Sequence, residues 1–279
     1  MEASEFFLLL IKIKEQAVTR KVWPGGVGLF MSKCVLLCKR NRNHVSHNNF
    51  TRQVTLLSRR MTPDNIPPVP PKIITADGIA MAIISPNEVL AVKGTSVAMG
   101  SIFSPPESWY IPCGRVPAGS FALFRSNEDK VELVTDMVGS RTVWYVQTPD
   151  LFLASTSQRA IVYFLESFDQ NEEACWWMLS SGMLGPGFAW DRRIRSIPPN
   201  SCLVLDRKSW NIHLGTEKTV CLAPQPSGDN HQLELESEIE ALIGDLDFDD
   251  EKWILALSGG FDSRMLLLSF LQSGRKSNA

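Results

Sequence analysis

The chain has 279 residues, of which 44% are hydrophobic and 21% are charged. This composition is typical of a globular protein that buries one large or two ordinary cores, and it excludes a fibrous or wholly disordered chain. The apolar run FFLLLIKI near the start is too short for a membrane span, which needs about eighteen apolar residues or more. Six cysteines in a chain of this length, without a secretory signal, predict reduced thiols. We therefore expect a cytoplasmic protein with no membrane partner.

Charge is distributed unevenly along the chain. Residues 1–60 contain eleven Lys or Arg and three acidic residues, whereas the remainder contains seventeen and twenty-seven. Acid-free basic segments occur as transit peptides, as nucleic-acid arms, or as extensions outside the folded unit. We interpret residues 1–71, which end in the Pro-rich stretch 66–71, as a basic, disordered extension and linker, and expect no nucleic-acid partner. A chain start at Met61 would remove most of it.

Short apolar runs alternate with turn sequences between residues 72 and 222. The runs predicted as strands are 79–84, 88–92, 120–124, 131–135, 142–146, 151–155, 201–206 and 210–214. The SNED and TPD turns predict two hairpins within one meander. Helical patterns occupy 157–168, with Ser157 as N-cap, and 172–184, before the Gly-Pro-Gly of 185–187. The sequence therefore predicts an antiparallel β-rich domain over residues 72–222.

The last segment, residues 230–279, has a different pattern. Apolar residues recur at helical spacing between 235 and 246, within an acidic background. Trp253–Leu257 is typical of a buried parallel strand, and Asp262–Gln272 of a packed helix that stops at Gly274. We expect these residues to form the N-terminal part of an α/β domain.

The residues between that strand and helix have the features of a phosphate-binding loop. Gly259 and Gly260 carry no Cβ that would keep backbone N–H groups from a ligand, and glycine permits positive φ. The N-terminus of the following helix attracts anions. Ser258 and Ser263 supply hydroxyl donors, and Asp262 can cap the helix or hold Mg²⁺. The spacing and lysine of a Walker loop are absent.

The hexapeptide SGGFDS resembles the signature of the ATP pyrophosphatase, or PP-loop, superfamily. Members of that superfamily cleave ATP between the α- and β-phosphates and adenylate a substrate. The resemblance implies ATP and Mg²⁺ as cofactors and leaves the catalytic residues unknown. The cofactor-binding residues that it implies are Leu257, Ser258, Gly259, Gly260, Asp262 and Ser263, with Asp262 as the Mg²⁺ ligand. A structural turn without a nucleotide is the alternative.

Two upstream stretches resemble asparagine synthetases. GSFALFRSNEDKVELVTDMVGSRTVWYVQTPDLFLASTSQRAIV is similar to the second half of their glutaminase domain, and LGPGFAWDRRIRSIPPNSCLVLD to the connector that follows. The matching positions are Asp136, Gly139, Arg141, Tyr145 and Ala154–Ser155. The resemblance covers residues 115–270 and implies an α+β, Ntn-hydrolase-like domain followed by the start of a PP-loop α/β domain. It also implies ATP-dependent amide formation on a small carboxylate such as aspartate, in asparagine biosynthesis.

The chain departs from that family in two places. The family's glutaminase uses an N-terminal cysteine as nucleophile, whereas residue 2 is Glu and a start at Met61 would expose Thr62. We therefore expect glutaminase activity to be lost. Family members also continue beyond the point that corresponds to Ala279, which predicts a truncated chain. A second copy of the chain or a complementing C-terminal half would be a suitable partner.

Two other functions stay open. β-Lactam synthetases and lasso-peptide cyclases look similar, carry glutaminase-like domains without a working cysteine, and use an internal amine in place of ammonia. The other alternative is a non-catalytic protein that binds ATP or serves as a partner subunit.

Overall fold

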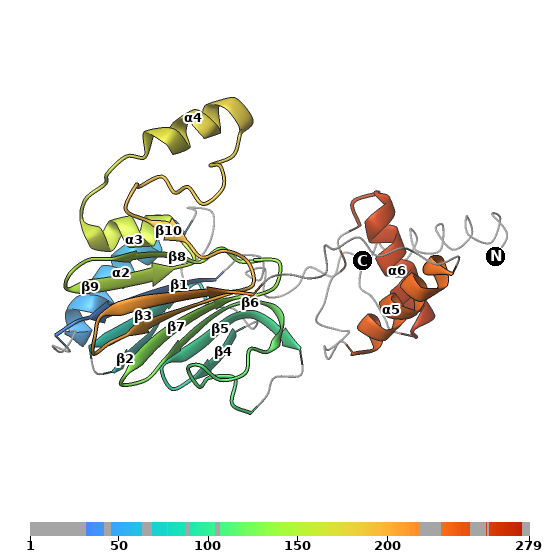
Figure 1. The fold of residues 1–279 in the computed structure, drawn as a ribbon, viewed down its shortest axis with the longest axis horizontal. Helices are drawn as coiled ribbons and strands as arrows, with labels where there is room; N and C mark the ends of the chain where they lie inside the picture. The colour runs from blue at the N-terminus through green and yellow to red at the C-terminus, as the bar shows by residue number, and fades with distance from the viewer. Residues whose placement is uncertain are drawn as a thin grey trace. The chain divides into compact units, whose positions relative to one another are not determined.

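The computed structural model describes residues 32–41, 46–62, 69–76, 78–86, 90–103, 107–217, 230–245, 255 and 257–274. They belong to two compact units, one within residues 27–223 and one that contains the described residues from 230 onward (Figure 1). We call the first unit the sheet domain. Within the ranges given, no helix is long and apolar enough to cross a membrane.

The sheet domain contains two six-stranded antiparallel sheets. Sheet A consists of β1 (Lys33–Lys39), β2 (Lys72–Ala76), β3 (Ile79–Ile84), β8 (Trp144–Gln147), β9 (Leu151–Ser155) and β10 (Arg195–Ser196), in the order β10-β8-β9-β1-β3-β2. Sheet B consists of β4 (Leu90–Lys93), β5 (Ser96–Phe103), β6 (Ala118–Ser126), β7 (Lys130–Thr135), β11 (Ser201–Asp206) and β12 (Asn211–Thr216), in the order β12-β11-β7-β6-β5-β4.

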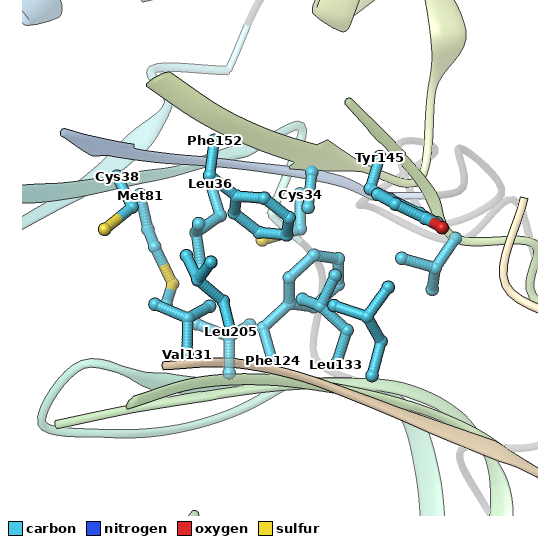
Figure 2. Packing of buried hydrophobic residues seen from close by; sticks show 14 of the residues in the cluster. Cys34, Leu36, Cys38, Met81, Phe124, Val131, Leu133, Tyr145, Phe152 and Leu205 are labelled. Carbon is cyan, nitrogen blue, oxygen red and sulfur yellow. The ribbon is translucent and has the colours of Figure 1, made fainter. Parts of the chain in front are cut away.

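The two sheets face each other and enclose what we call the inner core, which Figure 2 shows from close by. Side chains alternate between the two faces of a strand. Cys34, Leu36 and Cys38 of β1 accordingly point into the inner core. Val35 and Leu37 point to the opposite face of sheet A. Because both faces of β1 are covered, this strand is buried along nearly its whole length.

Helices cover the outer face of sheet A. α2 (His47–Met61) buries Phe50, Val54 and Leu57 against the sheet, and α3 (Gln158–Leu165) packs beside it. The rings of Phe50 and of a phenylalanine in α3 stack with their centroids 5.6 Å apart. The layer order is therefore helices, sheet A, sheet B, which is compatible with the predicted Ntn-hydrolase-like fold.

The predicted extension over residues 1–71 is wrong for two segments. Lys33–Lys39 is a central strand of sheet A, paired with β3 on one side and β9 on the other. His47–Met61 is a helix of the same domain. The apolar CVLLC sequence was not predicted as a strand because it is short, apolar on both faces and surrounded by basic residues. The sheet domain therefore begins before residue 72, while residues 1–31, 42–45 and 63–68 lie outside the described residues.

The prediction of an antiparallel β-rich domain is confirmed, and so are both hairpins, β6–β7 and β8–β9. Their placement in one meander is wrong, because β6–β7 lies in sheet B and β8–β9 in sheet A. The two predicted helices exist in shorter form as α3 and α4 (Glu172–Ser181), which ends at Gly182. The strands β2, β5 and β10 were not predicted from the sequence.

In the second unit, the structure describes two helices. α5 (His231–Asp245) and α6 (Phe261–Gln272) contact each other, and Ile243 and Leu267 are buried. Both helices were predicted. Trp253, Ile254 and Ala256 of the expected strand lie outside the described residues, and Leu255 and Leu257 belong to no strand. The PP-loop α/β domain therefore stays a prediction.

Candidate functional site

The predicted phosphate loop lies immediately before α6. Gly259 has a φ of +75°, in the left-handed region that favours glycine, and no atom lies within 4 Å of the position that a Cβ would take there. Gly260 is the N-cap of α6 and has an extended backbone. The backbone therefore turns sharply at Gly259 and leaves open space beside the loop.

The turn brings the two serines together. The Oγ atoms of Ser258 and Ser263 are 3.2 Å apart. The Ser258 hydroxyl also accepts from the backbone nitrogen of Gly260 at 3.4 Å, and the Ser263 hydroxyl donates to the carbonyl oxygen of Gly260 at 3.4 Å. Two hydroxyls thus converge at the start of the helix, where a bound anion would accept from both.

No side chain caps the start of α6, because Gly260 occupies the N-cap. The first backbone N–H groups of a helix have no partner within the helix. Asp262 lies in the first turn with an exposed side chain, so it does not serve as the cap. Leu257, the first residue of the predicted site, has 41% of its surface exposed. The residues of the loop are therefore open to solvent and to a ligand.

The fit to Mg²⁺ rests on Asp262. Nowhere in the residues that the structure describes do three or more His, Cys, Asp or Glu side chains group as a metal site. Magnesium in nucleotide sites usually keeps several waters and takes one or two carboxylates, with phosphates completing the shell. One exposed carboxylate at the loop fits that need only when a phosphate is bound.

Arg264 is a residue at this site that the sequence analysis missed. Its Nε atom donates to the carbonyl oxygen of Gly260 at 3.1 Å, and its guanidinium lies 5.2 Å from the centre of the Phe261 ring. These contacts hold a positive charge beside the loop. Its position one residue after the SGGFDS hexapeptide was the available signal.

The residues on which the resemblance to asparagine synthetases was based pack or form hydrogen bonds within the sheet domain. The Asp136 carboxylate is buried and accepts from the backbone nitrogens of Phe121 and Val138, both at 3.0 Å. Gly139 has a φ of +63°, and a Cβ there would lie 3.0 Å from a carbon of Pro199. Asp136 and Gly139 therefore shape the turn through which the chain passes from sheet B to sheet A.

The remaining matches are packed or bonded in the same region. Arg141 lies against Gly100, where a Cβ would come within 3.0 Å of its Nε atom. Tyr145 and Ala154 face the inner core. The buried Ser155 hydroxyl donates to the carbonyl oxygen of Cys34 at 2.6 Å. Each of these residues therefore has a packing or hydrogen-bonding role in the sheet domain.

The first strand offers no nucleophile of the kind that a glutaminase uses. Cys34 is fully buried in β1, and burial raises the pKa of its thiol above the ordinary value. A thiol in such surroundings stays protonated and unreactive. Cys38, four residues later, faces the same inner core.

A hollow of about 580 Å³ lies elsewhere, in the sheet domain beside the start of α4. Charges of both signs line it, from Glu172 and Glu173 on the helix and from Arg192 and Arg195 on the segment that follows. It includes none of the residues predicted to bind ATP. Its mixed charges do not favour a polyanion, so the loop before α6 remains the better candidate for phosphate.

No protein-family model matches the chain, and no curated protein matches its sequence. Among solved structures, the chain is similar to glutamine phosphoribosylpyrophosphate amidotransferase from B. subtilis, complexed with ADP and GMP. The TM-score is 0.30 and the identity 8%, over 66% of this chain and 49% of that chain. The match thus spans about half of that protein, and at this distance it carries no inference about function.

Proposed function

We propose that this chain binds ATP through residues 257–263 and belongs to an asparagine-synthetase-like system that adenylates a small carboxylate before an amide is formed. The observation that supports the proposal is the pair of hydroxyls of Ser258 and Ser263, whose Oγ atoms are 3.2 Å apart at the start of α6. No side chain caps this helix, and Gly259 just before it has a positive φ. We take aspartate as the carboxylate and asparagine as the product, because the sequence resembles asparagine synthetases.

The physical case is that the loop offers donors and little negative charge to a phosphate. The N-terminus of a helix carries a partial positive charge, and free N–H groups there bind anions. Ser258 and Ser263 add two hydroxyl donors, and Arg264 adds a cation. Hydrogen bonds to a charged group contribute about 1.5–3 kcal/mol each. In the proposed reaction these groups hold the β- and γ-phosphates, which leave as pyrophosphate.

Asp262 is the residue that would hold Mg²⁺ at the bound phosphates. When bound, Mg²⁺ supplies neutralisation of the negative charge on the phosphate oxygens. Without the metal, the exposed Asp262 carboxylate would repel ATP, so its own contribution to binding depends on Mg²⁺.

Glutamine hydrolysis is not included in the proposal. The thiols of Cys34 and Cys38 are buried in the inner core, where glutamine has no access to them. Because β1 supplies no accessible thiol, we take an amine other than glutamine-derived ammonia as the group that completes the reaction. This observation favours, as a second candidate, an enzyme of the β-lactam synthetase or lasso-peptide cyclase type, which joins an internal amine to the activated carboxylate.

The test is calorimetric titration of the complete chain with ATP, with and without Mg²⁺. We expect Ser258→Ala and Ser263→Ala each to weaken binding by about 10- to 100-fold, from the loss of one charge-assisted hydrogen bond. Ser269→Ala is the matched control, because this hydroxyl donates to the carbonyl oxygen of Met265 within α6, away from the loop. Equal affinity in all variants, or no binding of ATP, would refute the loop as a nucleotide site.

A second experiment separates an enzyme from a non-catalytic binder. ATP–pyrophosphate exchange that depends on aspartate is expected if the chain adenylates this substrate. If the chain binds ATP but no added carboxylate supports ATP–pyrophosphate exchange, the chain is a non-catalytic ATP-binding protein and not an adenylating enzyme. Asp262→Ala should abolish the gain in affinity that Mg²⁺ gives, and an unchanged gain would contradict the role of Asp262.

A further inference from the structure

The segment 107–117, which we call the covering loop, lies on the outer face of sheet B. Trp109 of this loop packs against a buried cluster formed by Ala98, Phe121, Leu123 and Val134. The carbonyl oxygen of Tyr110 accepts from the Ser96 hydroxyl at 2.8 Å. The loop is therefore fixed to the sheet at several points.

A buried ion pair fastens the middle of the loop. The side chains of Arg125 on β6 and Glu132 on β7 have 0% and 2% of their surface exposed, and Nη1 of the arginine lies 3.2 Å from Oε2 of the glutamate. The Arg125 guanidinium also donates to the carbonyl oxygens of Trp109, Gly114 and Arg115 at 2.6–3.0 Å. Three carbonyl groups of the covering loop thus accept from the Arg125 guanidinium, which the ion pair with Glu132 holds in place.

The Glu132 carboxylate joins two cysteines. Oε2 accepts from the backbone nitrogen of Cys113 at 2.8 Å, and Oε1 accepts from the thiol of Cys202 at 2.9 Å. Cys113 is an exposed residue of the covering loop with a φ of +60°. Cys202 is half-buried on β11. Two cysteines from segments far apart in the sequence therefore meet at one carboxylate.

The two thiols have unequal surroundings. The Lys130 ammonium lies 3.6 Å from the Cys113 sulfur. It stabilises the negative charge that builds on this sulfur when it acts as a nucleophile. Burial, then the hydrogen bond to Glu132, raises the pKa of Cys202. Cys113 is thus the exposed thiol beside a cation, and Cys202 is the protonated thiol that donates to Glu132.

We propose that Cys113 and Cys202 are an oxidant-responsive thiol pair, in which a hydroperoxide oxidises Cys113 and Cys202 then closes a disulfide that ties the covering loop to β11. In the first step the Cys113 sulfur attacks the peroxide, the O–O bond breaks, and the sulfur becomes a sulfenic acid while the departing oxygen takes a proton. In the second step the Cys202 sulfur attacks the Cys113 sulfur. The S–S bond forms, the S–O bond breaks, and the departing hydroxyl takes the Cys202 proton and leaves as water.

With hydrogen peroxide, one peroxide is reduced to two waters and two thiols are oxidised to one disulfide. A disulfide requires Cα atoms about 4.4–6.8 Å apart. Closure of the disulfide therefore requires the Cys113 side chain to turn from Lys130 toward Cys202, and Cys113 lies in a loop outside the strand ladders of sheet B. Cys34 and Cys38 are enclosed in the inner core and do not compete for the oxidant.

The test is mass spectrometry of the complete chain after hydrogen peroxide, alkylation of the remaining thiols, and trypsin digestion. Cleavage after Lys and Arg places Cys113 in peptide 94–115 and Cys202 in peptide 196–207, each with one cysteine. We expect these two peptides joined and lighter than their sum by two hydrogens. The joined species should disappear in Cys113→Ser and Cys202→Ser and persist in Cys175→Ser, the control on α4.

Two further measurements test the roles of Cys202 and Lys130 in the oxidation of Cys113. Cys202→Ser should accumulate a sulfenic acid on Cys113, trapped by a 1,3-diketone reagent. Lys130→Gln should slow the loss of the Cys113 thiol by about two- to fivefold, the range of one exposed charge contact, whereas Lys208→Gln, which removes an exposed lysine paired with Asp129, should not. Absence of the joined peptides in the unmodified protein, with Cys113 passing to the sulfinic acid, would overturn the proposal, and so would equal rates in the two lysine variants.

Discussion

Replacing Glu132 by Ala tests whether the buried pair with Arg125 holds the covering loop in place. The substitution leaves the fully buried Arg125 guanidinium with three carbonyl acceptors and no counter-charge. It also removes the acceptor of the Cys113 backbone nitrogen and of the Cys202 thiol. Removal of one partner of a buried pair costs about 3–5 kcal/mol. We expect a loss of that size, since the two smaller losses belong to the same network and do not add in full.

The assay is urea unfolding followed by tryptophan fluorescence, with Trp109, Trp144 and Trp210 reporting on the sheet domain. At an m-value of about 1–3 kcal/mol/M, such a loss lowers the urea midpoint by about 1 M or more. Lys208→Gln is the matched control, because it breaks an ion pair whose side chains are 70% and 53% exposed. Such exposed pairs contribute about 0–1 kcal/mol.

A double substitution tests whether the unpaired charge of Arg125 causes the loss of stability in Glu132→Ala. Arg125→Met with Glu132→Met removes both charges, so no unpaired charge stays in the interior. Replacement of a buried ion pair by apolar residues of similar volume is often neutral. The three loop carbonyls lose their donor in the double variant, so we expect it to regain part of the stability that Glu132→Ala loses. Unfolding of Glu132→Ala at the same urea concentration as Lys208→Gln would show that the buried pair does not hold the loop.

Three other outcomes are expected. Burial opposes ionisation of Asp191, but hydrogen bonds from Arg193 and from two backbone nitrogens outweigh it and hold the pKa of Asp191 below its ordinary value. The stability that this carboxylate contributes is thus present above the unfolded pKa of about 3.9 and is lost as pH falls through the folded pKa. Asp191→Asn should be less stable than the unmodified protein at pH 7, and the difference should shrink in urea midpoints measured toward pH 3. Gly139→Ala should cost about 1–3 kcal/mol, because φ is +63° and the new Cβ meets Pro199; an unchanged thermal midpoint would contradict this. Phe50→Ala should cost about 3–5 kcal/mol, since this ring is 1% exposed, whereas a disordered extension would give no change in unfolding.

Strands were predicted from alternation or from an apolar run that a turn sequence follows. Ile79–Ile84 is an apolar run of the second kind, buried on both faces and predicted with its exact bounds. Ser201–Asp206 alternates buried and half-buried residues, which is the period-2 pattern that defines a strand from sequence. Lys33–Lys39 has no such alternation, because helices cover one face and sheet B the other. Its apolar run is too short to separate a buried strand from other structures by pattern alone. The charge of its neighbours then led the interpretation away from a folded segment.

The helix that follows carried a signal that could have been used. Phe50, Val54 and Leu57 recur at spacings of four and three, as an amphipathic helix requires. The Ser46 hydroxyl accepts from the backbone nitrogen of Asn49 and caps the helix. A serine before such a run predicts a helix even in an acid-free segment.

Turn sequences predict pairing between neighbours and say little about distant partners. The SNED turn led correctly to the β6–β7 hairpin, yet no local feature tells which sheet contains β8 and β9. In the candidate site, glycine placed the positive φ at residue 259, and the short spacing brought Ser258 to Ser263. Glu132 and Cys202 are 70 residues apart, and their contact depends on the pairing of β7 with β11, which the sequence alone does not reveal.

The central position of β1 has a consequence for shorter forms of this protein. A chain that began at Met61 would lack β1, which joins β9 to β3, and the described strands of sheet A would be left as two separate ribbons. Each ribbon would present a row of unpaired backbone groups, which invites pairing with other chains. The gap would fit one seven-residue strand that is apolar on both faces. A peptide of sequence KCVLLCK, supplied in trans, would restore the sheet by strand addition, as donor-strand complementation does in other proteins.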